Sequence, residues 1–309
     1  IPEVDIGDVA KNWTEEKAEL QKRQYYRLIT AAIRGGASEL QTWGFIDDGW
    51  RPGEKAFPYT NNYEPKPAYY GIKEALIDMS SVLFWEMDAP ANNIMPDVMK
   101  YNNFGTMKNF GTPVIVTGFK SKALKFDGID DYISSPVLSK SIADDFTFSC
   151  FIKTTATKAG VIADLPLNEN SGLKIGMNAE GKIYFDGTSA GLNEKLMSLK
   201  TVNDDTWHFI ALQRDSTTYR LYVDDSAPVA SKTGNITMFN KLVVGAKPNG
   251  NEPFEGAVDE VKLYDTAIEE ASFIRGFVPQ GPLKLTYISS QRKITLRWSD
   301  QSTDEAGFV

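Results

Sequence analysis

Residues 40–47 read Leu-Gln-Thr-Trp-Gly-Phe-Ile-Asp, a short apolar run that carries an indole, Trp43, and ends at a carboxylate. A second apolar run, Ile-Pro-Glu-Val-Asp-Ile at residues 1–6, carries Glu3. Short apolar runs bounded by polar residues predict strands. The chain between them, at residues 12–34, has apolar residues at helical spacing. The two runs therefore predict a strand–helix–strand unit.

The helical segment has start and stop signals of its own. Asn12 followed by Glu15 fits a capping box, and Gly35-Gly36 ends the helix. Pro67, after a long loop rich in Gly, Pro, Asn and Tyr, suits the first turn of a second helix. Residues 1–80 are therefore predicted to form a β-α-β-α segment.

The ends of these strands carry side chains suited to a sugar-cleaving site. Glycoside hydrolysis usually needs two carboxyl groups beside the scissile bond, and Glu3 offers one. A pyranose ring packs its C–H face on an indole, which Trp43 and Trp50 provide, with Asp47 nearby. The residues alone leave two alternatives open: a solvated strand end for Glu3, and ordinary core packing for the tryptophans.

Three motifs in this segment resemble glycoside hydrolase family 10, the endo-β-1,4-xylanases. Pro-Glu-Val-Asp at residues 2–5 is similar to the Thr-Glu-Leu-Asp-type motif of that family's seventh barrel strand. Trp-Gly-Phe-Ile-Asp at residues 43–47, followed by Trp50, resembles the eighth strand and its loop. Asn-Tyr-Glu-Pro-Lys-Pro-Ala-Tyr at residues 62–69 matches the family's next motif almost letter for letter.

The resemblance implies roles for three residues. Glu3 would be the nucleophile of a retaining enzyme, and Trp43 and Trp50 would line the subsites next to the cleaved bond. Pro2 and Ile46 stand where the family usually has Thr, and the segment between the two tryptophans is one residue shorter than usual. These departures affect the subsite geometry.

A (β/α)₈ barrel has eight strands, and residues 1–80 supply only two of them. In the family, the acid/base Glu and the His that accompanies the nucleophile lie on earlier strands. We therefore predict that the 309-residue chain by itself does not hydrolyse xylan. The family's chemistry implies no cofactor for catalysis.

Residues 81–275 change to short alternating strands. Examples are residues 146–152, 207–212 and 219–223. Turn dipeptides such as Asp127-Gly128 lie between such strands. Many short strands with turns of this kind predict an all-β sandwich or jelly roll.

Three stretches of this segment resemble a laminin-G-like, concanavalin-A-like jelly roll. They are residues 123–133, 206–211 and 254–264, with residues 83–88 as the first strand. Such modules bind glycans, bind proteins or space other domains. Some hold calcium through carboxylates near the first and last strands, which makes Asp88 and Asp259 candidate ligands.

Other polar residues of this segment have plainer interpretations. Asp127, Asp130 and Asp131 are typical of turns, in which their side chains accept hydrogen bonds from the backbone. His208, the only histidine, is predicted to be a strand residue packed beside Trp207 rather than a metal ligand.

Residues 280–309 contain two further strand patterns, at residues 284–287 and 293–298. Together with the turn after them, they resemble the start of a fibronectin type III domain. This resemblance implies a partial β-sandwich at the C-terminus, because a complete domain of this kind has about 100 residues.

The bulk composition limits the possible partners. The net charge of −8, with both signs mixed along the chain, disfavours nucleic acid. No apolar run reaches the ~18 residues of a membrane span. A single cysteine excludes an intrachain disulfide, and no feature indicates an obligate oligomer, so a monomer is expected. Both ends of the sequence read as cut, so the lack of a signal peptide does not indicate a compartment.

The sequence therefore predicts a multidomain chain: an incomplete (β/α)₈ barrel remnant, an all-β jelly-roll sandwich and a partial β-sandwich. The parent protein is predicted to be a secreted or cell-surface multimodular enzyme that acts on xylan or a related β-1,4-linked polysaccharide. Two alternatives stay open. One is a glycan- or protein-binding adhesion module with an inactive barrel remnant, and the other is a degenerate pseudo-enzyme.

Overall fold

The computed structural model describes most of the chain. Described are residues 6–7, 10–42, 44–47, 53–168, 171–192, 195–224, 228–232 and 238–269, and the strands at 278–279, 286–290 and 293–297. The chain divides into two compact units, residues 1–80 with 269–309 and residues 81–268. Each unit is described below by itself.

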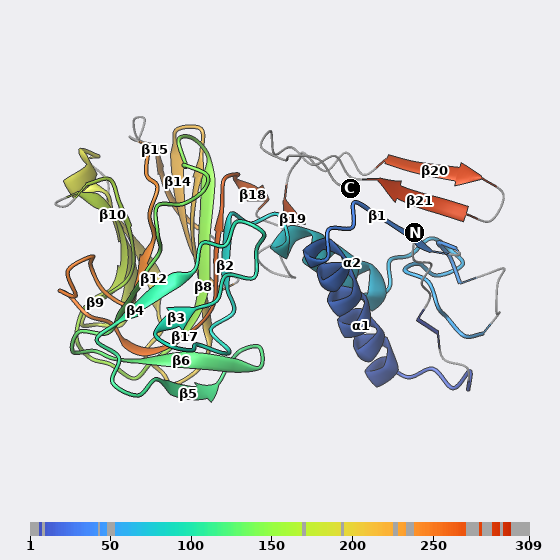
Figure 1. The fold of residues 1–309 in the computed structure, drawn as a ribbon, viewed down its shortest axis with the longest axis horizontal. Helices are drawn as coiled ribbons and strands as arrows, with labels where there is room; N and C mark the ends of the chain where they lie inside the picture. The colour runs from blue at the N-terminus through green and yellow to red at the C-terminus, as the bar shows by residue number, and fades with distance from the viewer. Residues whose placement is uncertain are drawn as a thin grey trace. The chain divides into compact units, whose positions relative to one another are not determined.

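The first unit contains two helices that pack against each other, α1 (Glu15–Arg34) and α2 (Pro67–Asp78) (Figure 1). Gly71 of α2 lies so close to the backbone carbonyl of Lys22 that a Cβ atom there would overlap it, which explains the glycine. Pro67 begins α2 as predicted. The predicted cap of α1 is wrong: Thr14, whose hydroxyl accepts a hydrogen bond from the amide of Lys17 at 3.2 Å, caps the helix in place of Asn12.

Three of the described strands of this unit form a sheet. β1 (Glu39–Thr42) pairs antiparallel with β21 (Lys293–Arg297), which pairs antiparallel with β20 (Thr286–Ser290). The two C-terminal strands predicted from the sequence are therefore present. The similarity of this segment to a fibronectin type III domain stays a prediction.

The second unit is a sandwich of two sheets, confirming the predicted jelly-roll class (Figure 1). One sheet contains, in the order in which neighbouring strands pair, β12 (Lys195–Thr201), β11 (Lys182–Asp186), β10 (Gly172–Met177), β9 (Gly160–Pro166), β16 (Val243–Val244), β7 (Tyr132–Ser134), β4 (Gly105–Lys108) and β3 (Ile94–Met95). We call it the β9 sheet.

The other sheet, called the β8 sheet, is also antiparallel. In order it contains β15 (Val229–Lys232), β14 (Thr218–Val223), β13 (His208–Asp215), β8 (Phe146–Lys153), β17 (Glu255–Tyr264), β6 (Lys122–Asp127) and β5 (Val114–Thr117). β2 (Leu83–Trp85) pairs with β17, so the predicted first strand is confirmed. The remaining short elements are η1 (Thr188–Ala190), β18 (Ile268–Glu269) and β19 (Val278–Pro279).

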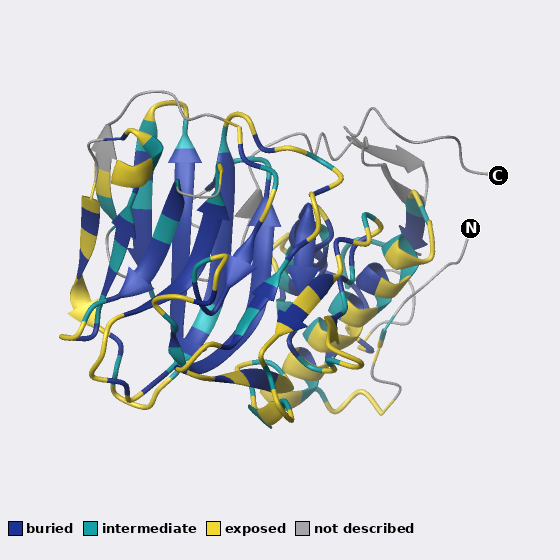
Figure 2. Ribbon diagram, turned by 60° about the vertical axis from the view of Figure 1, so that its left-hand side comes forward, coloured by how far each residue is buried: buried dark blue, intermediate teal, exposed yellow. Residues whose placement is uncertain are grey.

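The core of the sandwich lies between the two sheets. Figure 2 shows the strands of both sheets largely in the dark blue of buried residues. Aromatic rings fill much of the space: Phe185 stacks on Tyr219 at 4.9 Å between ring centroids, and Phe146 meets Phe239 edge-on at 5.2 Å. Aromatic pairs at such separations contribute about 0.5–1.5 kcal/mol beyond the burial of their area.

No helix among the described residues is both long enough and apolar enough to span a membrane.

Candidate functional site

The three residues with predicted roles in catalysis, Glu3, Trp43 and Trp50, lie outside the described residues. Their roles stay predictions. The described chain around them, at residues 44–47 and 53–66, shows how the strand end and the following loop are held.

A buried lysine ties this loop together. The Nζ atom of Lys66 lies 2.8 Å from Oδ1 of Asp47 and donates to the carbonyls of Lys55 and Phe57, each at 2.7 Å. An ammonium group has three N–H donors, so these contacts use all of them. Burial lowers the pKa of Lys66, and the nearby Asp47 carboxylate partly opposes that shift.

Asp47 has a structural role in this arrangement. Its Oδ1 atom also accepts a hydrogen bond from the amide of Phe57 at 3.1 Å. The amide of Asp47 donates to the carbonyl of Tyr59, and the amide of Tyr59 donates to the carbonyl of Phe45, both at 3.1 Å. The loop is therefore fixed against the strand end between Trp43 and Trp50, and Asp47 positions it.

In the second unit, the predicted calcium ligands Asp88 and Asp259 both contact the turn between β5 and β6. Oδ2 of Asp259 accepts a hydrogen bond from the amide of Lys120 at 2.9 Å, and Oδ1 of Asp88 accepts from the amide of Lys122 at 2.8 Å. The turn brings the two carboxylates together, although they are far apart in the sequence.

Asp259 is fully buried, and its Oδ1 atom has no hydrogen-bond partner among the described residues. Burial, with smaller contributions from the negative charges of Glu260 and Asp88, raises the pKa of Asp259 to about 7. Glu260 is held by two lysines, with its Oε2 atom 3.4 Å from Nζ of Lys120 and 3.1 Å from Nζ of Lys262. A bound cation would supply the partner that Oδ1 of Asp259 lacks.

A second acidic group lies at Asp127, Asp130 and Asp131, whose carboxylate oxygens lie within 4.8 Å of one another. Oδ1 of Asp127 accepts from the amide of Ile129 at 2.7 Å, and Oδ2 of Asp131 accepts from the amide of Asp127 at 3.1 Å. The predicted turn role of Asp127 and Asp131 is therefore confirmed. Burial raises the pKa of Asp131 to about 6, because it outweighs the hydrogen bond from the Asp127 amide.

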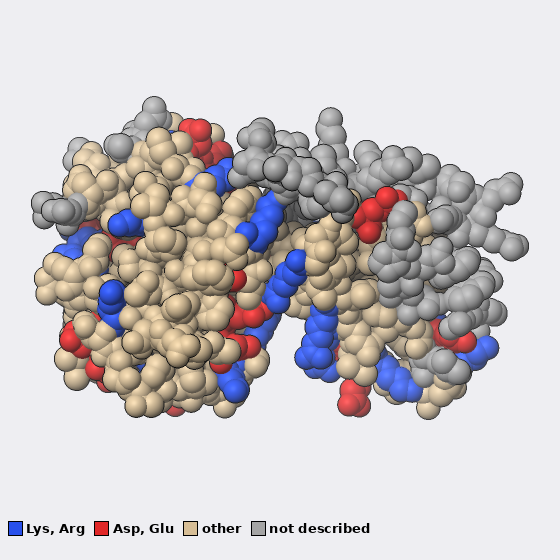
Figure 3. Space-filling view, viewed as in Figure 1, with Lys and Arg blue, Asp and Glu red and all other residues tan. Residues whose placement is uncertain are grey.

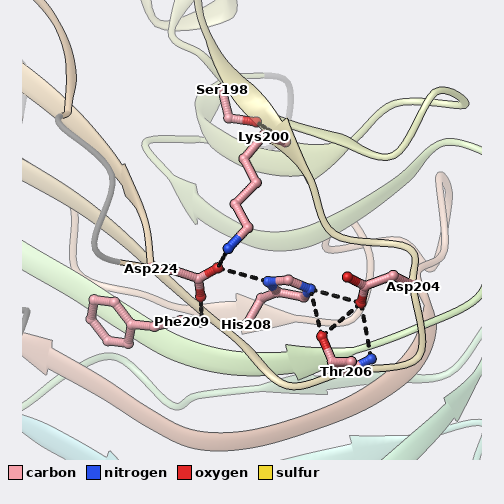
Figure 4. Close-up of polar contacts among 7 residues, drawn as sticks. All are labelled: Ser198, Lys200, Asp204, Thr206, His208, Phe209 and Asp224. Atoms are coloured by element: carbon pink, nitrogen blue, oxygen red, sulfur yellow. Dashed lines mark hydrogen bonds and ion pairs between the residues drawn. The ribbon is translucent and has the colours of Figure 1, made fainter.

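His208 begins β13, as predicted, but it lies in a polar cluster that the sequence analysis missed (Figure 4). Its Nδ1 atom is 2.8 Å from Oδ2 of Asp224, and its Nε2 atom is 2.9 Å from Oδ1 of Asp204. The Thr206 hydroxyl is 3.1 Å from Nε2, and Lys200 pairs with Asp224. Figure 4 shows the imidazole between the two carboxylates.

The hydrogen bonds hold both carboxylates of this cluster in the ionised form. Those from His208 and Thr206 lower the pKa of Asp204. Burial acts to raise the pKa of Asp224, but hydrogen bonds from Lys200, His208 and the Phe209 amide outweigh it and lower that pKa. The cluster therefore favours a charged network.

The cluster contains a hydroxyl, an imidazole and a carboxylate, the groups of a nucleophile with its base. The Thr206 hydroxyl, however, donates to Oδ1 of Asp204 at 2.7 Å, so its proton is already engaged by a carboxylate. Lys200 lies in the β9 sheet, whereas Asp224 follows β14 in the β8 sheet. The arrangement thus connects the two sheets and serves the fold.

The sequence carries one signal for this cluster. The residues Asp204, Thr206 and His208 alternate just before a strand. Asp224 comes close only because Ile210 of β13 is opposite Val223 of β14, a register that the sequence does not state.

Comparisons with solved structures found distant similarities. The receptor-binding domain of botulinum neurotoxin D has 15% identity and a TM-score of 0.48, covering 63% of this chain and 52% of that chain. The binding domain of Paraclostridial Mosquitocidal Protein 1 has 16% identity and a TM-score of 0.47, covering 64% and 51%. The chain thus spans about half the length of these structures. A search of curated proteins found no match.

Two protein-family models match separate parts of the sequence. The glycosyl hydrolase family 10 model matches residues 1–75. The model described as the concanavalin A-like lectin/glucanases superfamily matches residues 127–272, which include most strands of the sandwich. The chain is therefore similar to glycosyl hydrolase family 10 over residues 1–75 and to the concanavalin A-like superfamily over residues 127–272.

Proposed function

We propose that this chain is part of a multimodular retaining glycoside hydrolase that acts on xylan or a related β-1,4-linked polysaccharide, with Glu3 as nucleophile and Trp43 and Trp50 in the adjacent subsites. The family 10 match at residues 1–75 is the observation that supports it. Because a cell-wall polymer is met outside the cell, we place the parent protein in the extracellular space or at the cell surface.

In this proposal, residues 81–268 hold the enzyme on its substrate. A weak binder tethered to a catalytic domain raises the local substrate concentration without taking part in the chemistry. The side chains on the face drawn in Figure 3 suit a neutral partner, because Lys and Arg are scattered among Asp and Glu over the described part of this unit.

The second candidate is a glycan- or protein-binding module in which the barrel segment is inactive. It is favoured by the contrast between the two units: the jelly roll has a large core of its own, whereas the family 10 match extends over 75 residues. A (β/α)₈ barrel typically needs about 250 residues. For the chain as it stands, binding is the expected behaviour.

Two assays test the proposal. The purified chain is incubated with insoluble xylan and cellulose, and both the bound protein and the released oligosaccharides are measured. We expect retention on a polysaccharide and no product. Released xylose oligomers would contradict the expected inactivity, and lack of retention on either polymer would favour a protein-binding or spacer role.

A chimera tests the catalytic part separately. Residues 1–78 replace the corresponding end of a complete family 10 barrel. We expect the chimera to hydrolyse xylan and its Glu3→Gln variant to lose that activity, since the family's chemistry depends on the nucleophile. An equally active Glu3→Gln chimera would exclude Glu3 from that role.

We also propose that Asp88 and Asp259 hold a calcium ion in the jelly roll. Carboxylate oxygens are ligands that calcium prefers, and the buried Oδ1 atom of Asp259 is without a partner among the described residues. Calcium would fix the β5–β6 turn to the middle of β17 and to the segment that follows β2.

A further inference from the structure

The face of the β9 sheet that points away from the core carries an unusual group of side chains. Along β9, β10 and β11, alternate residues such as Ala163, Ile175 and Phe185 enter the core. Because side chains of a strand alternate between faces, their neighbours Asp164, Lys174 and Asp186 share the outer face. Lys174 is opposite Asp164 on one side and Asp186 on the other.

Asp164 lies at the floor of this face without a hydrogen-bond donor for one of its oxygens. The residue is only 6% exposed, and its Oδ1 atom is buried with no partner among the described residues. The nearest ammonium groups are engaged elsewhere: Lys174 lies 4.0 Å from Oδ2 of Asp186, and Lys247 pairs with Glu252. A buried carboxylate oxygen without a donor costs free energy, so the feature needs an explanation.

Tyr184 lies on the same outer face, two residues before Asp186 in β11. A Cβ atom on Gly176 would be 2.6 Å from Cζ and 2.5 Å from the hydroxyl of Tyr184, so the phenol ring lies over this glycine. The half-buried ring is close enough for the charges of Glu252, Asp186 and Asp164 to add to the effect of burial, which raises its pKa to about 12.

A glycine also makes room for the carboxylate. A Cβ atom on Gly172 would overlap Oδ1 of Asp164, so the carboxylate lies directly against the backbone of β10. Gly172 and Gly176, on either side of Lys174, thus leave the surface of β10 open for the Asp164 carboxylate and the Tyr184 ring.

A sugar ring offers the contacts that a phenol ring and a carboxylate can each make. Its C–H face packs on an aromatic ring, and its hydroxyl groups donate hydrogen bonds to a carboxylate. The ammonium groups of Lys174 and Lys247 oppose a cation here, while Asp164, Asp186 and Glu252 oppose an anion. A neutral ligand meets neither repulsion.

We propose that the outer face of β9, β10 and β11 binds one residue of a neutral oligosaccharide, with Tyr184 beneath the sugar ring and Asp164 accepting hydrogen bonds from its hydroxyl groups. This inference rests on the proposed glycan-binding function and assigns it a place in the fold.

The test measures binding of xylohexaose and cellohexaose to the 309-residue chain by isothermal titration calorimetry. We expect the wild-type chain to bind one of them, and Asp164→Asn and Tyr184→Ala to weaken that binding by about tenfold or more, since hydrogen bonds to charged groups and ring contacts have energies of this order. Asp144→Asn, the same chemical change at an exposed loop residue, is the control and is expected to bind within about twofold of the wild type.

The melting temperature of the Asp164→Asn variant distinguishes a loss of sugar binding from a loss of folding stability. Asp164→Asn removes a buried charge without a donor, so we expect the variant to melt no lower than the wild type at pH 8 while it binds the sugar more weakly. A purely structural Asp164 would lose stability and binding together, and that result overturns the proposal.

Two further outcomes distinguish failure of this site from failure of the glycan-binding function. If the wild-type chain binds an oligosaccharide and both variants bind it as tightly, the site is elsewhere; the glycan-binding function survives and this inference fails. If the wild-type chain binds neither oligosaccharide at millimolar concentration, the glycan-binding function and this site fail together.

Discussion

At the scale of single residues, the jelly roll contains buried and half-buried carboxylates whose pKa values are shifted in opposite directions. Asp259 and Asp164 lack donors for an oxygen, and burial raises their pKa values to about 7 and about 6. Asp224 receives hydrogen bonds from Lys200, His208 and a backbone amide, and its pKa is lowered. Burial alone therefore does not determine the direction of the pKa shift, because hydrogen bonds from donors act against it.

Asp259 gives a pH-dependent prediction. Its pKa is higher in the folded chain than in the unfolded chain, so its ionisation opposes folding as the pH rises from about 4 to about 7. Calcium would reverse this cost by pairing with the ionised form. We expect calcium to raise the melting temperature clearly at pH 8 and much less at pH 5.5, as measured by differential scanning fluorimetry.

The matched variant for this prediction is Asp259→Asn. It should lose both the calcium response and the fall in stability between pH 4 and pH 7. If the variant keeps the full calcium response, the ion binds elsewhere, and the group at Asp127, Asp130 and Asp131 becomes the next position to test.

Asp224 gives the opposite prediction. Its lowered pKa contributes stability that is present above the ordinary aspartate pKa and lost as the pH falls through the folded value. We expect Asp224→Asn to reduce the free energy of unfolding at pH 7 by about 1–3 kcal/mol, since hydrogen bonds to a charged group are lost. Urea unfolding at pH 7 and pH 3 checks this: the difference between variant and wild type should shrink at pH 3.

How far the sequence predicts these residues depends on how local their partners are. Alternation in β9 identifies Asp164 as an outward residue, but its missing donor depends on Lys174 and Lys247, which pair with Asp186 and Glu252. Charges brought together by sheet pairing cannot be located before the register is known.

At the scale of elements, hydrophobic alternation and turn residues were sufficient to predict three strands of the jelly roll. The predicted strands at 146–152, 207–212 and 219–223 correspond to β8, β13 and β14 within three residues at their ends. The error in the helix cap at Asn12 has a local cause. Asn12 and Thr14 are both good capping residues, and backbone geometry selects between them.

A glycine in β4 shows how closely the sheets pack. A Cβ atom on Gly105 would lie 2.5 Å from Cγ2 of Ile133 and 2.8 Å from Cζ2 of Trp85. We expect Gly105→Ala to lower the free energy of unfolding by about 1–3 kcal/mol, the usual range for overpacking a core. Gly111→Ala is the control, because a Cβ atom there has no neighbour within 4 Å. Equal stabilities of the two variants in urea unfolding would contradict the packing described here.

At the scale of the whole molecule, the two units have separate cores. Trp85, Phe126 and Phe148 belong to the core of residues 81–268, and Tyr25 and Ile72 to that of the first unit. The sequence predicts three segments, at residues 1–80, 81–275 and 280–309, from the change of helical spacing to alternation near residue 81 and the further strand patterns after residue 280. The family assignments rest on motifs that are local in sequence, such as residues 62–69, and these need no structure to be recognised.

Because the jelly roll has its own core, residues 81–268 are expected to fold alone. We expect this fragment to unfold in a single cooperative transition, as small domains usually do, with a melting temperature within a few degrees of the corresponding transition in the full chain. Differential scanning calorimetry of both proteins checks this. A fragment without a cooperative transition would show that the first unit is needed for folding.

The single cysteine of this protein can report on the opening of the β8 sheet. Cys150 lies in β8 between β13 and β17, fully buried, and burial raises its pKa. Only an exposed thiolate reacts readily with a disulfide reagent, so labelling has to wait until the middle of the β8 sheet opens. The rate at which the native protein consumes such a reagent therefore measures, without any engineered probe, how often the sheet around Cys150 opens in residues 81–268.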